Sequence, residues 1–346
     1  MRHLKTTSMG EQMTRKDPRV WISFIALVLQ NTSLVLILRY SRTVKTEKYL
    51  SSTAIVTAEA VKGLLSVVLV WWENGCSITR FCRVVQEEIY QKPYETSKLA
   101  IPSGIYSIQN NLLFIALSYL NAATYQVTYQ LKILTTALFS VYMVKKKLDK
   151  HQWFSLFMLA LGVALVTWPT SEESAKRSSN QNQVTWLQQS IGFGAVLLSA
   201  ITSGFSGVYF EKLLKTSSSS VWVKNIQLAI FGIIFGLIVV FCFDGKAVME
   251  KGFFQGYTNI VWTVIFLQAF GGLIIANVIK YADNIVKGFA TSLSIVLSCI
   301  ISYFFLHDFT PSSFFYMGTL SVLAATVLYA WEKPKMILPT TEQAYV

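Results

Sequence analysis

Charged residues are scarce in this sequence. Asp, Glu, Lys and Arg make up 14% of its 346 residues, whereas a soluble domain has about 25%. Hydrophobic residues, in contrast, make up 53% of the chain. A water-soluble protein of this size could not cover its surface with so few charges, and the same composition excludes a disordered chain, a coiled coil and a collagen. We therefore expect a protein that crosses a membrane several times.

Cysteine and histidine are also rare, with four and three residues that are scattered along the chain. Neither residue type occurs at the spacing of a metal site, and the sequence has no motif for nucleotide hydrolysis or a catalytic triad. The longest polar internal segment, residues 73–98, contains glutamates but no metal-binding grouping, which disfavours a membrane-bound glycosyltransferase. We expect no metal, no cofactor and no enzymatic activity.

The formal net charge of +12 would by itself suit a nucleic-acid-binding protein. Most basic residues, however, lie in short runs between apolar stretches, where they act as signals for membrane orientation. We therefore expect the chain to contact a lipid bilayer and no nucleic acid. Residues 1–19 are polar and charged, so we expect no cleavable signal peptide and a first apolar segment that directs its own insertion.

Ten apolar stretches are long enough to cross about 30 Å of hydrocarbon, which takes about 20 helical residues. In lipid, backbone groups find partners only within helices or closed barrels, and the alternation typical of a barrel is absent from the sequence. The predicted helices span residues 20–38, 52–72, 99–120, 122–144, 152–168, 190–210, 225–243, 260–279, 284–306 and 312–331.

Ten crossings would place both termini on one side of the membrane. The segments on that side contain 19 Lys and Arg residues, and the opposite loops contain 8. The positive-inside rule then predicts that both termini are cytosolic. The loop at 39–51 opposes this rule locally, because half of the eight basic residues lie there.

The two halves of the chain resemble each other. The segment from Lys132 aligns with the segment from Lys287 with small insertions, so that Asp149 matches Asp308. Because the implied repeat has five helices, an odd number, the halves would enter the membrane in opposite orientations, as in secondary transporters with a substrate site at the midplane. The predicted organisation is a cytosolic tail (1–19), a first repeat (20–168), a lumenal linker (169–189), a second repeat (190–331) and a cytosolic tail (332–346).

Lys132 is the most informative single residue. It lies near the middle of the segment 122–144, roughly 15 Å from either membrane surface. A lysine stem of about 6 Å cannot reach that far, so its ammonium group needs an anionic partner or a wet cavity. We expect a substrate role, and the structural alternative is a buried ion pair with Glu59.

Polar and aromatic side chains share the helix face of Lys132. A Tyr ring can stack on a base and hydrogen-bond through its tip, so the face suits a ring and a phosphate, although interhelical hydrogen bonds would use the same groups. On the segment 99–120, Tyr106 and Asn110 repeat one turn apart and should face the interior. The residues on the Lys132 face are Tyr125, Thr128, Tyr129, Thr135 and Thr136.

Other polar residues of the predicted helices allow two interpretations each. Lys287 could bind substrate like Lys132 or reach the cytosolic headgroups, and Asn225 could cap its helix or hydrogen-bond a base. Glu59 and Lys62, three residues apart, most simply form a local ion pair. Their functional alternative is a gate or a charge balance for the substrate.

Three stretches are similar to a known family: YSIQNNLLFIALSYLNAATYQVTYQLK, GFSGVYFEKLLK followed by VWVKNIQL, and KYADNIVKGFATSLSIVLS. They resemble the nucleotide-sugar transporters of the CMP-sialic acid, UDP-galactose and UDP-N-acetylglucosamine group. The resemblance extends from about Ser33 to Trp331. Shorter strings, such as RYSRT, YLSSTA and KGFATSLS, are most similar to the UDP-N-acetylglucosamine branch.

The resemblance implies an all-α polytopic membrane protein of the Golgi, with ten transmembrane helices as two inverted five-helix repeats in the drug/metabolite transporter fold. It also implies that the protein exchanges cytosolic UDP-N-acetylglucosamine for lumenal UMP by alternating access. A homodimer, or a complex with related transporters or glycosyltransferases, would be consistent with it. The nucleotide site would fall on Tyr106, Asn110, Tyr125, Lys132, Gly204 and Asn225, with Lys287 nearer the phosphate or sugar.

The chain departs from the CMP-sugar branch of this family at several positions. Ala229 stands where that branch has a tyrosine, and Ile275 and Ala276 replace a hydroxyl pair. We therefore expect UMP to bind better than CMP. Ser292 and its neighbours offer hydroxyl groups where that branch is alanine-rich, which suits a different sugar. The alternatives are a UDP-galactose or broad UDP-sugar carrier and a non-transporting scaffold subunit of glycosylation complexes.

Overall fold

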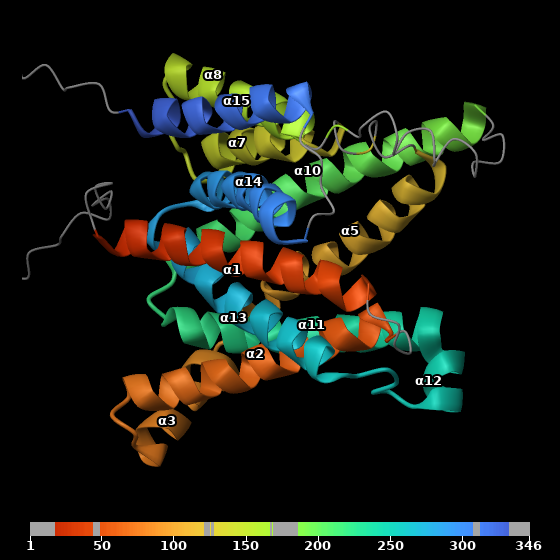
Figure 1. Cartoon of the computed structure of the whole chain (residues 1–346). Coiled ribbons are helices and arrows are strands. Elements are labelled where there is room, and N and C mark those ends of the chain that lie inside the picture. The colour runs from red at the N-terminus through yellow and green to blue at the C-terminus, as the bar shows by residue number, and fades with distance from the viewer. Residues whose placement is uncertain are drawn as a thin grey trace, which may run out of the picture.

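The computed structural model describes residues 18–43, 49–120, 125, 128–166, 168, 186–306 and 312–331, which are mainly α-helical and contain no strand (Figure 1). Short helices α3 (Ile78–Val85), α4 (Pro93–Ser97) and α12 (Gly245–Lys251) accompany the long ones. The long helices are α1 (Pro18–Thr43), α2 (Ser51–Glu73), α5 (Ala100–Tyr119), α7 (Leu131–Met143), α8 (Lys150–Val166), α10 (Trp186–Thr216), α11 (Val221–Val239), α13 (Asn259–Tyr281), α14 (Asn284–Ile301) and α15 (Ser313–Ala330).

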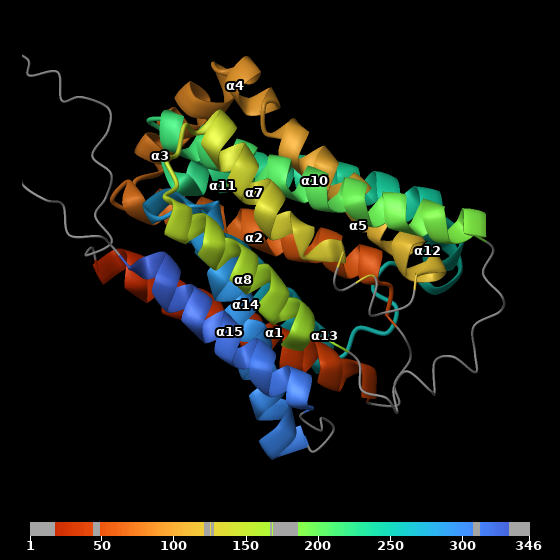
Figure 2. The same ribbon diagram turned by 90° about the horizontal axis from the view of Figure 1, so that it is seen from above.

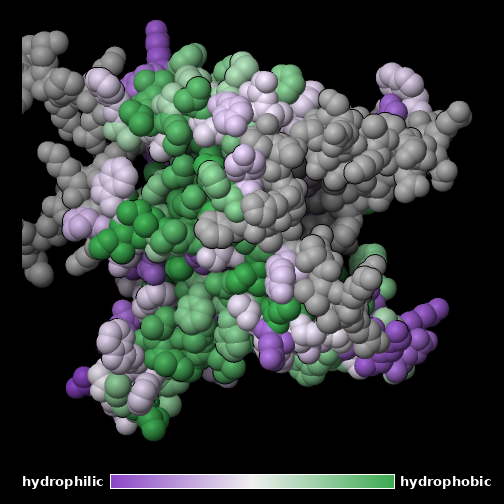
Figure 3. Space-filling model, in the orientation of Figure 1, coloured by the Kyte–Doolittle hydropathy of each residue, from purple (hydrophilic) through white to green (hydrophobic). Residues whose placement is uncertain are grey.

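Seven segments of the described chain are helices long and apolar enough to cross a membrane: α1, α2, α10, α11 with its extension to Lys251, α13, α14 and α15. The helices α7 and α8 are apolar but shorter, with 13 and 17 residues. Large apolar side chains remain exposed on many of these helices, and Figure 3 shows them across the middle of the molecule, with hydrophilic residues gathered at α12. The protein is therefore a polytopic α-helical membrane protein.

The helices pack as antiparallel and crossing pairs (Figures 1 and 2). The helix α8 packs on α15, α10 on α5 and α7, α11 on α2 and α5, and α1 on α13 and α14. Small residues allow the closest of these approaches: a Cβ atom added to Gly162 would lie 3.0 Å from the Val322 backbone nitrogen. The apolar side chains between α7, α8, α14 and α15, including Leu156 and Leu159, form the largest buried cluster that the structure describes.

Two described helices extend beyond their predicted spans. The helix α1 includes Pro18 and Arg19, which precede the predicted span of 20–38. The helix α10 begins at Trp186, inside the predicted linker 169–189, and reaches Thr216. Its first two residues, Trp186 and Leu187, are apolar and exposed, so apolar surface lies beyond the predicted span of 190–210.

The segment 73–98, expected as a polar loop, folds into α3, α4 and a π-helical turn between them. Gln227 of α11 anchors this segment, because its Nε2 donates to the backbone oxygen of Glu88 and to Thr96 Oγ1, both at 2.9 Å. Lys92 donates to the Glu88 carboxylate at 2.8 Å, and this bond, with a second from Ser219, holds the pKa of Glu88 below its ordinary value.

Candidate functional site

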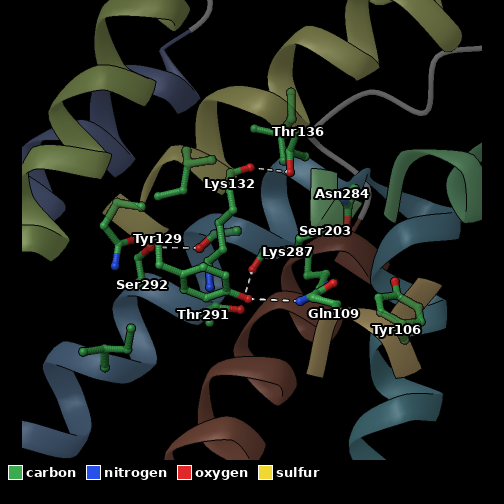
Figure 4. Close-up of a pocket in the computed structure, with 15 residues that line it drawn as sticks. Tyr106, Gln109, Tyr129, Lys132, Thr136, Ser203, Asn284, Lys287, Thr291 and Ser292 are labelled. Atoms are coloured by element: carbon green, nitrogen blue, oxygen red, sulfur yellow. Dashed lines mark hydrogen bonds between the residues drawn. The ribbon is translucent and has the colours of Figure 1, made fainter. Parts of the chain in front are cut away.

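A cavity lies between α5, α7, α10 and α14, at the centre of the helix bundle (Figure 4). It encloses about 260 Å³, slightly less than the roughly 300 Å³ at which small-molecule sites begin. Both halves of the chain contribute to its wall. The polar lining residues are Tyr106, Gln109, Tyr129, Gln130, Lys132, Thr136, Ser203, Asn284, Lys287, Thr291 and Ser292.

The charge of the cavity comes from Lys132 and Lys287, and no Asp or Glu is among the described lining residues. The Lys132 ammonium lies over the ring of Tyr129, 4.2 Å from its centroid, which is a cation–π contact. Glu59, the alternative ion-pair partner considered for Lys132, pairs with Lys62, as the spacing of these two residues predicts. The two cavity lysines therefore form a cationic centre whose natural counterpart is an anion.

The two lysines also lie at helix N-termini. Lys132 is in the first turn of α7, and Lys287 is in the first turn of α14. Several backbone N–H groups at these ends already have partners: Asn284 donates to Glu211, Val286 donates to the Asp283 carboxylate, and Ile133 donates to the backbone oxygen of Gln130. The attraction of this part of the cavity for an anion therefore comes from the two ammonium groups and not from free helix ends.

Hydroxyl groups line the cavity one turn after each lysine. Thr136 donates to the Lys132 backbone oxygen at 2.7 Å, and Thr291 donates to the Lys287 backbone oxygen at 3.0 Å. Ser292 likewise donates to the backbone oxygen of Gly288 at 3.0 Å. Because their protons point back along the helix, these hydroxyls offer lone pairs to the cavity, and they can accept hydrogen bonds from ligand hydroxyl or N–H groups.

Two amide side chains complete the polar wall. Gln109 donates from Nε2 to the Tyr129 hydroxyl at 3.1 Å, while its Oε1 is buried without a hydrogen-bond partner among the described residues. The Oδ1 atom of Asn284 is likewise buried and unpartnered within the described chain. Sequence reasoning did not select Asn284, although its place three residues before Lys287, on the same helix face, was a usable signal.

Six of the residues selected from the sequence lie on the cavity wall, namely Tyr106, Tyr129, Lys132, Thr136, Lys287 and Ser292. Tyr125 lies behind them: its ring stacks on that of Tyr129 at 5.8 Å. The Tyr125 side chain also packs against the apolar contact between α5 and α10. The side chain of Asn110 lies outside the described part of the structure.

Gly204 and Asn225 lie in helix contacts instead of the cavity wall. A Cβ atom on Gly204 would lie 2.8 Å from the backbone nitrogen of Thr136, so this glycine sets the approach of α10 to α7. Thr135 fixes the same contact by donating to the Ala200 backbone oxygen at 2.8 Å. Asn225 is buried in α11 and donates to the backbone oxygen of Val221 at 3.1 Å.

Glu59 and Lys62 form the local ion pair that their spacing predicts, at 2.5 Å. Lys62 is 5% exposed and packs against Gly272 of α13, while Glu59 packs against Gly232 of α11. Neither residue is on the cavity wall. The pair therefore lies where α2 meets α11 and α13, which is compatible with the structural interpretation.

Of the residues that differ from the CMP-sugar branch, Ser292 lies on the cavity wall, whereas Ala229 and the pair at 275–276 lie away from it. Ala229 is buried on α11, where a Cβ atom added to Gly63 of α2 would lie 3.3 Å from it. Ile275 and Ala276 pack in the apolar cluster around α10, α11 and α13. The smaller size of Ala229 thus serves the close contact between α2 and α11.

A polar cluster that we name the corner clamp holds the turn between α13 and α14. Lys146 pairs with Asp283 and donates to the Tyr329 hydroxyl at 3.0 Å. Lys215 donates to the Glu211 carboxylate and to the backbone oxygen of residue 282, both at 2.7 Å. Glu211 in turn accepts the backbone N–H of residue 284 at 3.0 Å. Three successive residues of the turn are therefore fixed next to the cavity.

The ionisation of the corner clamp follows from its contacts. Burial disfavours the Asp283 carboxylate, but the attraction and hydrogen bond of Lys146, with the N–H of Val286, hold the pKa of Asp283 below its ordinary value. Burial likewise disfavours the Lys146 ammonium, and Asp283 outweighs this effect and raises the pKa of Lys146. Both groups are thus charged near neutral pH.

The profile of the family described as "Nucleotide-sugar transporter" matches residues 18–330. A UDP-N-acetylglucosamine transporter of Rattus norvegicus is 56% identical over 322 residues, which cover 92% of this chain and 98% of the relative. A UDP-galactose translocator of Bos taurus is 47% identical over 310 residues, covering 90% of this chain and 77% of the relative.

A solved crystal structure of a protein 12% identical to this chain has the same fold, with a TM-score of 0.62 over 90% of this chain and 96% of the other. The family profile spans nearly all of the sequence, and two of these relatives agree with it over most of the chain. Together with the apolar helices and the cationic cavity, these matches establish that the chain belongs to the nucleotide-sugar transporter family and is a transporter, not an enzyme.

Proposed function

We propose that the protein is a Golgi antiporter that exchanges cytosolic UDP-N-acetylglucosamine for lumenal UMP. The observation that carries this proposal is the cavity with Lys132, Lys287 and no carboxylate among its described lining residues. Such a site favours phosphate groups. The tyrosine faces and hydroxyls around it suit a base and sugars.

The charges of the two ligands support exchange. A UDP-sugar carries about two negative charges, and UMP, with a second phosphate pKa near 6, carries nearly two. Either ligand would neutralise the two lysines, whereas the empty cavity keeps two ammonium groups without a counter-ion. An uncompensated buried charge costs several kcal/mol, so the empty carrier should cross between its states much more slowly than the loaded one.

The choice of UDP-N-acetylglucosamine rests on the relatives that carry this name, at 55% identity or more. A UDP-galactose translocator at 47% identity makes UDP-galactose the second candidate. The hydroxyl-rich wall of α14, with Thr291 and Ser292, supports a sugar close to the phosphates for either substrate.

Two inverted five-helix repeats would relate α1, α2, α5, α7 and α8 to α10, α11, α13, α14 and α15. The packing supports this relation: α10 packs on α5 and α7 as α1 packs on α13 and α14, and α2 packs on α13 as α11 packs on α5. The Lys132–Thr136 hydrogen bond has its equivalent in Lys287–Thr291. A site between such halves suits alternating access.

The corner clamp supports a state that is closed on one side. It lies at the end of the bundle where the described chain begins and ends (Figure 1), which the charge distribution assigns to the cytosol. A cytosolic ligand could enter only after the clamp opens. The small cavity volume agrees with this closed state, because a whole nucleotide sugar needs more room.

A competition assay on proteoliposomes tests the proposal. Purified protein is reconstituted, and uptake of labelled UDP-N-acetylglucosamine is measured with UMP, CMP, GMP and UDP-galactose as competitors. The proposal predicts strong competition by UMP and weaker competition by CMP and GMP. Equal competition by UMP and CMP would contradict the uridine assignment, and absence of uptake would favour a scaffold.

A further inference from the structure

Asn284 has a buried side chain whose capacity for hydrogen bonding is unused. Only 5% of the residue is exposed, it lines the cavity, and its Oδ1 has no hydrogen-bond partner among the described residues. A buried acceptor without a partner destabilises the empty protein. Figure 4 places this side chain beside Ser203 at the cavity. A ligand in the cavity could therefore supply the missing donor.

The local packing fixes the Asn284 amide in this position. Its backbone N–H donates to Glu211 Oε2 at 3.0 Å, which anchors the first residue of α14. On α10, Gly207 leaves just enough room for the amide, since a Cβ atom there would lie 3.0 Å from Asn284 Cγ. The side chain is thus held against α10 before any ligand arrives, as a preorganised contact requires.

The position of Asn284 indicates which ligand group it meets. Lys287 follows three residues later on the same helix face, where neighbouring Cβ atoms are about 5–6 Å apart. Phosphate oxygens, which the proposed function assigns to the lysines, are acceptors and cannot satisfy an amide oxygen. The group at Asn284 must instead be a donor close to a phosphate, and in a nucleotide sugar this is a hydroxyl of the ribose or of the transported sugar.

We propose that Asn284 is a ligand-binding residue that accepts a hydrogen bond from a sugar hydroxyl adjacent to the bound phosphate. The inference rests on the proposed function, because it takes the anion at Lys132 and Lys287 to be a nucleotide phosphate. It adds to that function a specific acceptor on the second half of the chain, fixed by the same Glu211 carboxylate that belongs to the corner clamp.

The test measures the affinity of purified wild type, Asn284→Ala and Asn284→Ser for UMP and UDP-N-acetylglucosamine by calorimetry. Loss of one hydrogen bond should weaken binding by roughly tenfold. Equal weakening of both ligands would assign the contact to the ribose, and weakening of the UDP-sugar alone would assign it to the transported sugar. The serine variant keeps a small polar residue at the helix start if alanine impairs folding.

Gln30→Leu is the matched control. Gln30 is also a buried amide (8% exposed) whose Oε1 has no partner among the described residues, but it lies on α1, away from the cavity wall. This variant should bind both ligands like the wild type. Unchanged affinities in both Asn284 variants, or an equal loss of affinity in Gln30→Leu, would overturn this inference and leave the proposed function standing. A wild type that binds neither ligand would refute the proposed function as well.

Discussion

Lys132 and Lys287 lie in the same cavity without a described carboxylate among its lining residues, and this distinguishes them from Lys62, a buried cation of α2. Lys62 has Glu59 at 2.5 Å, so its charge is already balanced within the protein. Among the described residues, the Lys132 ammonium contacts the face of Tyr129 and no carboxylate. A cation–π contact compensates a buried charge only in part, and under the proposed function an anionic ligand would supply the rest.

We expect Lys132→Gln to weaken UMP binding by about 10- to 100-fold, because a hydrogen bond to a charged group contributes roughly 1.5–3 kcal/mol. The variant should fold normally, since no described carboxylate loses its partner. Binding is measured by calorimetry and folding by thermal unfolding in detergent. Lys246→Gln, which removes an exposed charge on α12, is the control and should bind like the wild type.

Removal of Lys62 should lower the stability of the fold, whereas removal of Lys132 should lower the affinity for UMP. Lys62→Gln leaves Glu59, whose side chain is 26% exposed, as a partly buried charge without its partner, so we expect a loss of about 1–3 kcal/mol in the free energy of unfolding. Thermal or denaturant unfolding checks this expectation. A Lys62→Gln protein as stable as Lys132→Gln would contradict the distinction between the two lysines.

Residue types and helical spacing were sufficient to select Lys132, Lys287 and Tyr106, because an ammonium or polar face in a membrane helix must point inward. The positions of Gly204 and Asn225 could not be predicted in the same way. Whether a small or polar residue faces a ligand or a neighbouring helix depends on the crossing of α7, α10 and α11, which no local pattern encodes. Asn284 was not selected from the sequence because it lies at the start of a helix, where an asparagine is usually explained as a helix cap.

At the scale of helices, α10 offers a comparison of two glycines. A Cβ atom on Gly204 would clash with the backbone of α7, whereas one on Gly194 would meet nothing within 4 Å. We expect Gly204→Ala to destabilise the protein by about 1–3 kcal/mol through overpacking. Gly194→Ala should be neutral or stabilise it by up to about 1 kcal/mol through helix propensity. Equal thermal stability of the two variants would contradict the described approach of α10 to α7.

The corner clamp makes a prediction for pH. The lowered pKa of Asp283 stabilises the fold above about pH 4, the ordinary Asp value, and this contribution is lost as pH falls through the folded-state pKa. The raised pKa of Lys146 stabilises the fold below about pH 10.4, the ordinary Lys value, and this contribution is lost as pH rises further.

We therefore expect Asp283→Asn to cost about 3 kcal/mol near pH 7, and the difference from wild type to shrink below about pH 4. Asparagine also caps helices well, so the loss reports the ion pair and not the cap. Unfolding is followed against pH, with Lys146→Gln/Asp283→Asn as the control. The double variant should lose less than the sum of the single losses. A difference independent of pH would contradict the ion pair.

For the whole molecule, apolar composition was sufficient to predict a polytopic helical protein, because lipid leaves backbone groups few alternatives. The segment 73–98 was expected as a loop, but it folds into short helices held by Gln227. Short amphipathic helices have too few turns for a clear periodic pattern, and this one depends on a contact with α11 that lies far away in the sequence.

Exchange on proteoliposomes tests the central claim most directly. Vesicles containing the purified protein are preloaded with UMP, with CMP or with buffer, and the uptake of labelled UDP-N-acetylglucosamine is followed. The proposed function requires an anion at the two lysines on both the inward and the outward step. UMP inside the vesicles should therefore accelerate uptake strongly, and CMP should accelerate it less. Uptake into vesicles that contain only buffer should stay near background. Uptake that is equally fast in all three preparations would contradict the account.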